Sequence, residues 1–576
     1  MKRKEAEKQI RKKVLAGLLM GSLFAGACLG CGSSEKEAAV ETTEAAESTA
    51  DMTPAIGGTG QDLIMADMPM EQEQNAEEYS ESEEKGFVSV YSEPLSTFSA
   101  DVDTASYSNL RRLIREGYGI EALPEGAVRI EEMINYFTYQ DLKEPEAREP
   151  FGVTTQMMPC PWNEDSQLLR IGLKTEEMEY EDLPASNLVF LLDVSGSMYA
   201  DDKLPLLQES FAVLAENLTE KDRVSIVTYA GEDAVILEGV SGDETKTICK
   251  ALYALEAGGG THGSKGIETA YRLAEEYFIE GGNNRVILAT DGDLNVGLTT
   301  EEELEELITE KKESGVFLSV LGFGTGNIKD NKMETLADKG NGNYAYIDSL
   351  REANKVLVEE MSATLLTVCK DVKIQVEFNP AVVEEYRLIG YDNRRMAAED
   401  FDDDTKDAGE IGAGHCVTAL YEIITKEPVD ENGRNTEDLK YAEFYEKEGY
   451  DGEVPAYRQE EEAAEGKTGG DKEAAEETEN YKEYEWLTVS IRYKEPEGSE
   501  SKLLEYPVDY ASYTQEPGED FRFAAVVAEF GLAARDSAYK QEASLKHVEQ
   551  VLKNMDLGDE YKEEFLELVQ ELKGNS

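Results

Sequence analysis

The sequence is short of basic residues, and this deficit excludes one large class of partner. It contains 56 lysines and arginines against 122 aspartates and glutamates, for a formal net charge of −66. A chain with this balance repels phosphate backbones and lacks the basic surface that nucleic-acid-binding proteins present. We therefore expect neither DNA nor RNA among its partners.

Cysteine is also scarce, and its spacing excludes a structural zinc site. Apart from two cysteines near the N-terminus, the remaining four stand far apart in the sequence: Cys160, Cys249, Cys369 and Cys416. None of these has a companion at the spacing of zinc ligands. Isolated cysteines are most often small buried apolar residues, which is the role that we expect for them.

No apolar run reaches the ~20 residues that a membrane-spanning helix needs. The apolar stretch 14–29 follows a basic N-terminus and ends in small residues and cysteine, which is typical of a secretory signal. The residues around it resemble a bacterial lipoprotein box, with Cys31 as the lipidated residue and Cys28 as the alternative. This resemblance implies export and a lipid anchor at the outer face of the cell membrane. A permanent membrane-spanning helix is the competing interpretation.

The middle of the chain alternates between strand and helix patterns. Residues 188–192 form a continuous apolar run, as expected for a strand buried on both faces, and apolar residues at helical spacing follow over 204–218. The same change of pattern recurs after the strands expected at 223–229, 285–290, 316–322 and 344–348. This alternation predicts an α/β fold with a doubly wound, mostly parallel sheet.

The flanking regions differ from this domain in composition and period. From residue 372 onward, apolar residues alternate with polar ones, which predicts antiparallel strands, and helical spacing returns near the C-terminus. We expect a lipoprotein signal over 1–31, a disordered acidic tether over 32–86, an N-terminal α/β region over 87–180, the central domain over 181–366, and a β-rich and helical C-terminal domain over 367–576 with a disordered acidic insert at about 427–484.

Side chains with oxygen atoms gather in loops where the central strands are expected to end. They are Asp193, Ser195, Ser197, Thr261 and Asp291. Ligands of doubly wound sheets bind at the carboxyl ends of the strands. Hard oxygen donors favour Mg²⁺, with Mn²⁺ or Ca²⁺ as alternatives, over zinc or copper. The competing interpretation is that the aspartate and the serines only cap the following helix.

These five residues in this order resemble the metal-ion-dependent adhesion site of von Willebrand factor A domains. The resemblance implies that Ser195, Ser197 and Thr261 bind the metal directly and that Asp193 and Asp291 act directly or through water. It also implies that the remaining coordination position accepts an acidic group of a partner.

Two further regions resemble the YfbK-like bacterial von Willebrand A proteins. One is the N-terminal stretch 97–107, which reads Thr-Phe-Ser-Ala-Asp-Val-Asp-Thr-Ala-Ser-Tyr, together with 128–137. The other comprises 397–401 and 407–415 in the C-terminal region. The resemblance implies the architecture of that family and leaves its activity open.

The favoured function is a binding module that holds a divalent cation and, through it, an acidic group of a protein or cell-envelope partner. We expect no enzymatic activity, because a metal-dependent hydrolase needs a general base and the sequence offers only Asp293 or His262 near the site. A scaffold or envelope assembly factor stabilised by the metal is the main alternative, and a hydrolase is the weaker one.

Overall fold

The computed structural model describes residues 77–80, 83–100, 103–146, 149–178, 183–230, 233–258, 265–292, 301–361, 366–426, 485–496 and 498–576. The expected signal, both candidate lipidation sites Cys28 and Cys31, the candidate ligand Thr261 and the acidic insert 427–484 lie outside these ranges. Within them, no helix combines the length and the apolar character needed to cross a membrane. The described residues all belong to one compact unit.

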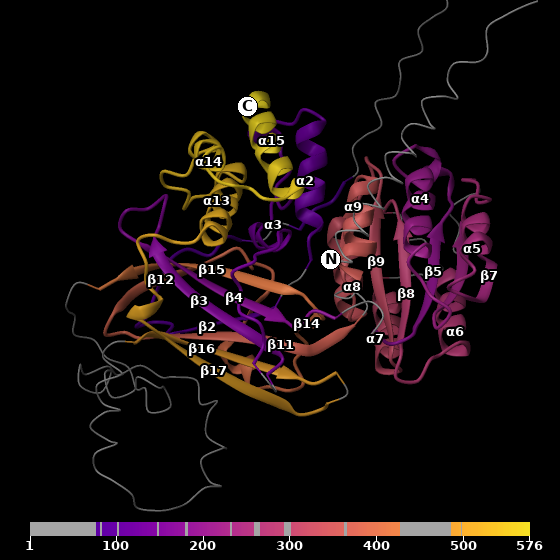
Figure 1. Cartoon of the computed structure of the whole chain (residues 1–576), viewed down its shortest axis with the longest axis horizontal. Helices are drawn as coiled ribbons and strands as arrows, with labels where there is room; N and C mark the ends of the chain where they lie inside the picture. Colours follow the sequence, from indigo (N-terminus) through magenta and orange to yellow (C-terminus); the bar gives the residue numbers. More distant parts are fainter. Residues whose placement is uncertain are drawn as a thin grey trace, which may run out of the picture. The chain divides into compact units, whose positions relative to one another are not determined.

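The central domain contains a six-stranded sheet with the order β10-β9-β8-β5-β6-β7 (Figure 1). Its strands are β5 (Ser186–Asp193), β6 (Arg223–Tyr229), β7 (Asp233–Ser241), β8 (Asn283–Thr290), β9 (Val316–Phe323) and β10 (Tyr344–Ile347). All neighbouring pairs are parallel except β6 and β7. Every residue of β5 and β8 is buried, which explains the unbroken apolar runs 188–192 and 286–289 within them. The predicted α/β fold is confirmed.

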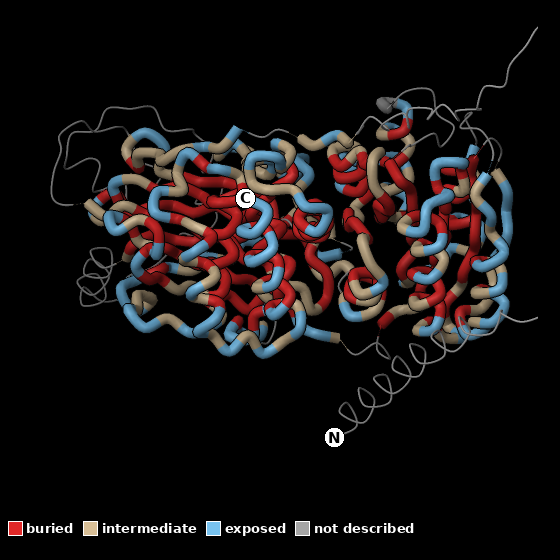
Figure 2. The backbone as a smooth tube through the Cα atoms, turned by 90° about the horizontal axis from the view of Figure 1, so that it is seen from above, coloured by how far each residue is buried: buried red, intermediate tan, exposed pale blue. Residues whose placement is uncertain are grey.

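Helices cover both faces of this sheet. They are α4 (Leu204–Ala215), α5 (Thr245–Leu252), α6 (Gly266–Glu276), α7 (Glu301–Glu313), α8 (Asp330–Lys339) and α9 (Leu350–Asn354), which continues into a π-helical turn (Lys355–Glu359). The apolar residues of α4, α5 and α9 pack on one face of the sheet, and those of α6, α7 and α8 pack on the other. In Figure 2 the buried residues lie in the interior and the exposed residues lie toward the outside.

Strand β7 and helix α5 were not anticipated from the sequence. β7 is the edge strand of the sheet, and its residues are half-buried or exposed rather than alternating between the two states. Val235 and Ile236 are adjacent and both 40% exposed, so neither of these apolar side chains is buried in a core. An edge strand of this kind lacks the period of two by which strands are recognised.

The remaining strands form two antiparallel sheets with the orders β1-β12-β15-β4-β3 and β13-β2-β11-β16-β17, and β14 pairs with β11. Those before the central domain are β1 (Val88–Ser89), β2 (Leu95–Ser99), β3 (Phe151–Pro159) and β4 (Gln167–Thr175). Those after it are β11 (Thr367–Phe378), β12 (Val383–Ile389), β13 (Arg395–Met396), β14 (Gly409–Gly412), β15 (Cys416–Thr425), β16 (Glu485–Lys494) and β17 (Ser501–Asp509).

Strands from both sides of the central domain therefore share the same sheets. β2 pairs with β11, and β4 pairs with β15. One apolar core takes side chains from both sheets, as in a β-sandwich. The sequence had suggested a separate C-terminal β unit, but the 87–180 and 367–576 segments are joined by strand pairing, with the α/β domain inserted between them.

A helical layer covers the sheet that contains β3, β4, β12 and β15. It is built from α2 (Ala105–Arg115), α3 (Ile130–Asn135), α13 (Glu519–Ala534), α14 (Leu545–Leu552) and α15 (Glu560–Asn575). These helices share one apolar core with side chains of that sheet. The helices come from both ends of the chain, so the N- and C-terminal segments stabilise each other.

Residues 77–80 and 83–86 fall within the stretch 32–86 that was expected to be disordered, and the structure shows them in ordered contacts. Glu77 forms an ion pair with the buried Arg112, at 3.0 Å between Oε2 and Nη2. The backbone of Glu78 donates to Ile328 and accepts from Asp330. Glu84 lies 3.2 Å from Arg387. Glu77 and Glu84 neutralise buried arginines, a role that composition alone does not reveal.

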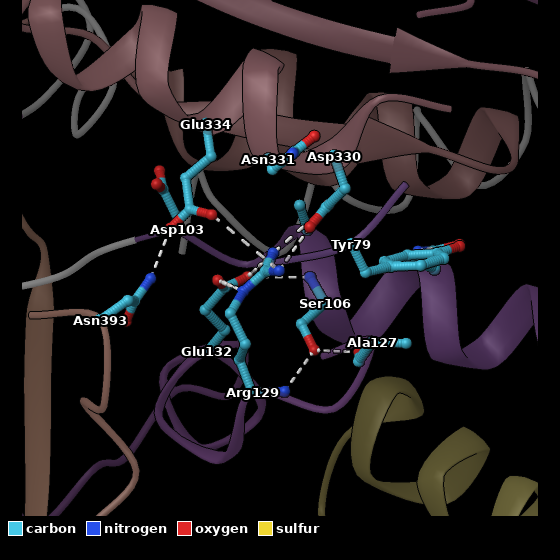
Figure 3. A network of polar contacts seen from close by, with 12 residues as sticks. Tyr79, Asp103, Ser106, Ala127, Arg129, Glu132, Asp330, Asn331, Glu334 and Asn393 are labelled. Carbon is cyan, nitrogen blue, oxygen red and sulfur yellow. Dashed lines mark hydrogen bonds and ion pairs between the residues drawn. The ribbon is translucent and has the colours of Figure 1, made fainter. Parts of the chain in front are cut away.

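A buried ionic cluster around Arg129 connects the inserted domain to the preceding segment (Figure 3). Its guanidinium pairs with Glu132 of α3 and with Asp330 at the start of α8. Glu132 also accepts a hydrogen bond from the backbone N–H of Ser106, at 2.8 Å. All four residues are buried, so the arginine neutralises charges from two parts of the chain away from water.

Candidate metal site

Asp193 is the last residue of β5 and is completely buried. Its Oδ1 accepts the backbone N–H of Ser195 at 2.8 Å. Its Oδ2 accepts the hydroxyls of Thr290 at 3.1 Å and Tyr229 at 3.4 Å. Strands β6 and β8 lie on either side of β5, so neighbouring strand ends hold this carboxylate in one orientation.

Burial raises the pKa of Asp193 to about 6. The hydrogen bonds from Ser195 lower the pKa, while the charge of Asp291 raises it. The electrostatic influence of Asp291 is consistent with the two carboxylates meeting at the carboxyl ends of adjacent strands. A bound cation would compensate both charges in this water-poor position.

Ser195 and Ser197 lie in the loop that leaves β5. Their hydroxyl oxygens are 2.9 Å apart, within hydrogen-bond distance, so the two side chains face each other. Ser195 is 2% exposed and precedes the 3₁₀ helix Gly196–Tyr199. Ser195 occupies the N-cap position of this 3₁₀ helix but makes no side-chain capping bond, so capping does not explain this serine. The backbone N–H of Gly258 donates to Val194 O at 2.8 Å, so Gly258 lies beside this loop.

Asp291 follows β8 and is 1% exposed. Its Oδ2 accepts a bond from Lys203, whereas its Oδ1 is buried without a hydrogen-bond partner among the described residues. The next residue, Gly292, has φ +111°, and a Cβ there would lie 2.1 Å from Asn327 O. Only glycine fits this turn, which fixes the direction in which Asp291 leaves the strand.

Lys203 is the residue at this site that sequence reasoning missed. It lies immediately before α4, and its Nζ is 2.8 Å from Asp291 Oδ2. Its side chain is only 11% exposed. The site motif comprises oxygen donors alone, and a lysine at the start of a helix is unremarkable in sequence, so no pattern marked it.

The structure thus places Asp193, Ser195, Ser197 and Asp291 at adjacent strand ends, and Thr261 lies outside the described residues. The orphaned oxygen of Asp291 and the facing hydroxyls are the hard donors that Mg²⁺, Mn²⁺ and Ca²⁺ use. Their assignment as ligands remains a prediction.

Another acidic group, formed by Asp371, Asp407 and Glu410, lies in the β-sandwich region. Lys494 pairs with Asp371 and Lys312 pairs with Asp407, each at 2.7 Å. These lysines already compensate two of the three carboxyl groups. We assign no metal to this group.

Three family models match the chain. The model described as von Willebrand factor type A domain covers residues 187–360. The model for the C-terminal part of the uncharacterized protein YfbK covers 363–458 and 453–574, and one described as von Willebrand factor covers 73–170. These matches coincide with the inserted domain and with the segments that flank it.

Over 502 residues the chain is 40% identical to the uncharacterized protein YfbK of Escherichia coli (strain K12), and the match covers 85% of this chain and 80% of that protein. The chain belongs to the YfbK family. It is also 28% identical over 203 residues to the inter-alpha-trypsin inhibitor heavy chain H3 of Mus musculus, a match that covers 33% of this chain and 22% of that protein.

Among solved structures, a von Willebrand factor type A protein from Catenulispora acidiphila is similar to this YfbK-family chain, with 14% identity over 69% of this chain and 81% of that one, and a TM-score of 0.36. The ArnB paralog VWA2 from Sulfolobus acidocaldarius is 13% identical, and the match covers 74% of this chain and 98% of that one, with a TM-score of 0.32. The predicted membership of the YfbK-like von Willebrand A family is confirmed by the first relative and the family models.

Proposed function

We propose that this YfbK-family protein is a cell-surface lipoprotein that binds a divalent cation in its von Willebrand A domain and, through it, an acidic group of a protein or cell-envelope partner. Mg²⁺ is the favoured ion, with Mn²⁺ and Ca²⁺ as alternatives. The protein acts as a binding module in this proposal and not as an enzyme.

The observation that carries the proposal is the carboxylate of Asp291. One of its oxygens is buried with no hydrogen-bond partner among the described residues, beside the buried carboxylate of Asp193. A buried, unsatisfied carboxylate oxygen is destabilising unless something binds it. A metal held by Asp193, Ser195, Ser197, Thr261 and Asp291 would satisfy this oxygen and supply a position for a partner's carboxylate.

The location of the protein is the second part of the proposal. Lipidation of Cys31, or of Cys28, would fix the chain at the outer face of the cell membrane. The acidic stretch that follows the signal would then separate the folded part from the membrane surface. Metal binding and membrane attachment would together present the site to envelope components.

Replacing Asp193 and Ser195 together by alanine is the direct test of the metal site. We expect the double variant to lose the Mg²⁺ and Mn²⁺ binding that isothermal titration calorimetry detects in the wild-type protein, because two donors and one of the two buried negative charges are removed. The variant should also lose the metal-dependent rise in melting temperature.

The matched control is Asp556→Ala, which removes one exposed carboxylate far from the site in sequence. This variant should bind metal as the wild-type protein does. Equal metal binding by the double variant and the wild-type protein would contradict the site. The partner is tested by crosslinking in intact cells: recovery of a protein that disappears with chelator supports metal-mediated binding, and recovery unaffected by chelator favours a scaffold.

A further inference from the structure

Lys203 lies beside the candidate metal site in a fixed position. Its backbone N–H donates to Ala200 O at 3.0 Å, and its carbonyl accepts from Leu207 N at 2.8 Å, so the turn before α4 holds it. Its ammonium group lies 2.8 Å from Asp291 Oδ2. The residue as a whole is 9% exposed. A lysine is rarely buried to this extent unless its charge is paired.

The loop after β9 is shaped to receive the lysine stem. Gly324 has φ +74°, and a Cβ at this position would lie 2.2 Å from Lys203 Cγ and 2.5 Å from Cε. The carbonyl of Gly324 accepts the hydroxyl of Tyr346 at 2.9 Å, which holds the loop in place. The absence of a side chain at residue 324 therefore makes room for the lysine next to Asp291.

The lysine and a metal ion can share Asp291 because each can use a different oxygen. Oδ2 accepts the bond from Lys203, while Oδ1 has no partner among the described residues. Among the described residues, Lys203 forms an ion pair with Asp291, one of the two buried aspartates of the site. The ammonium therefore cancels one of two negative charges before any metal binds.

We propose that Lys203 is a resident cation that weakens metal binding at this site and leaves the loaded site with a positive charge for an anionic partner to neutralise. The inference rests on the proposed function and goes beyond it by naming a residue that sets specificity. Two carboxylates and one ammonium carry a single negative charge, so a divalent ion makes the total positive by one. Without the lysine, the loaded site would be neutral and would lose this preference for an acid over a neutral group.

The first experiment measures Mg²⁺ and Mn²⁺ affinity of the full chain with Lys203→Met, which keeps an apolar stem against Gly324 and removes the charge. We expect about tenfold tighter metal binding or more, because a positive charge close to the ion is removed in a water-poor site. Lys203→Gln serves as the second variant, since its amide can still donate to Asp291, and it should also bind metal more tightly.

The control is Lys553→Met, which changes the net charge equally but removes an exposed lysine of a surface ion pair with Glu549. Its metal affinity should equal that of the wild-type protein. Unchanged or weaker metal binding in both Lys203 variants would overturn the role of the lysine while leaving the metal site standing. If none of these proteins binds metal, the wild-type protein included, the metal site and this inference are both overturned.

The second experiment uses acetate as the smallest carboxylate probe. The dissociation constant for the metal is measured in acetate and in chloride at equal ionic strength. Both titrations are expressed in free metal concentration. We expect acetate to tighten metal binding to the wild-type protein more than to Lys203→Met, since only the former carries a positive charge when loaded. An equal effect on both proteins would overturn the proposed preference for an anionic partner.

Discussion

Replacing Arg129 by methionine is expected to lower the free energy of unfolding by about 3–5 kcal/mol. The guanidinium Nη2 lies 3.3 Å from Glu132 Oε2 and 3.4 Å from Asp330 Oδ1, and further atoms of the group pair with both carboxylates. Both acids are at most 1% exposed, so removal of the arginine leaves two buried charges without this partner. Urea denaturation monitored by circular dichroism measures the loss.

The control for this prediction is Arg272→Met on the surface of α6. Arg272 lies 3.1 Å from Glu276, one helical turn away, and both side chains are more than half exposed. Exposed pairs of this type contribute about 0.3–0.5 kcal/mol, so the control should stay within about 0.5 kcal/mol of the wild-type protein. Similar losses in the two variants would contradict the assignment of Arg129 as the buried link between α3 and α8.

Replacing Gly292 by alanine should destabilise the protein by about 2–5 kcal/mol and also abolish metal binding. A left-handed backbone costs a residue with a Cβ about 1–2 kcal/mol, and overpacking against the Asn327 carbonyl adds about 1–3 kcal/mol. The new methyl group must displace either the loop around Asn327 or the turn that carries Asp291. Thermal melts with and without Mg²⁺ measure both effects.

Gly117→Ala separates backbone strain from the steric clash. Gly117 also has a positive φ, of +95°, but a Cβ there meets nothing within 4 Å. This control should lose only the backbone contribution of about 1–2 kcal/mol and bind metal normally. A Gly292→Ala protein that is no less stable than Gly117→Ala, and that binds metal as the wild-type protein does, would show that the turn does not position Asp291.

The sequence was sufficient to predict the inserted domain because its core strands are buried on both faces. Strands such as 188–192 appear as continuous apolar runs, and the helices between them keep helical spacing. The candidate residues Asp193 and Asp291 could be located for the same reason. Asp193 directly follows such a run and Asp291 follows one after a single threonine, where parallel strands expose their carboxyl ends.

Other features depend on contacts that no local pattern contains. The pairing of β2 with β11 joins residues 95–99 to 373–377, so neither strand indicates its partner. Glu77 belongs to an acidic stretch typical of disorder and is ordered by Arg112. The position of Lys203 at the site depends on the space left by Gly324 and on its ion pair with Asp291. These two residues come from separate loops.

The most direct test of the central claim is a crystal structure of the protein grown in Mn²⁺, with anomalous scattering used to locate the ion. The account predicts an anomalous peak bound by the hydroxyls of Ser195 and Ser197 and next to Asp291, with Lys203 still paired to the other oxygen of that carboxylate. A fully occupied peak elsewhere in the protein, together with no peak at these residues, would contradict it.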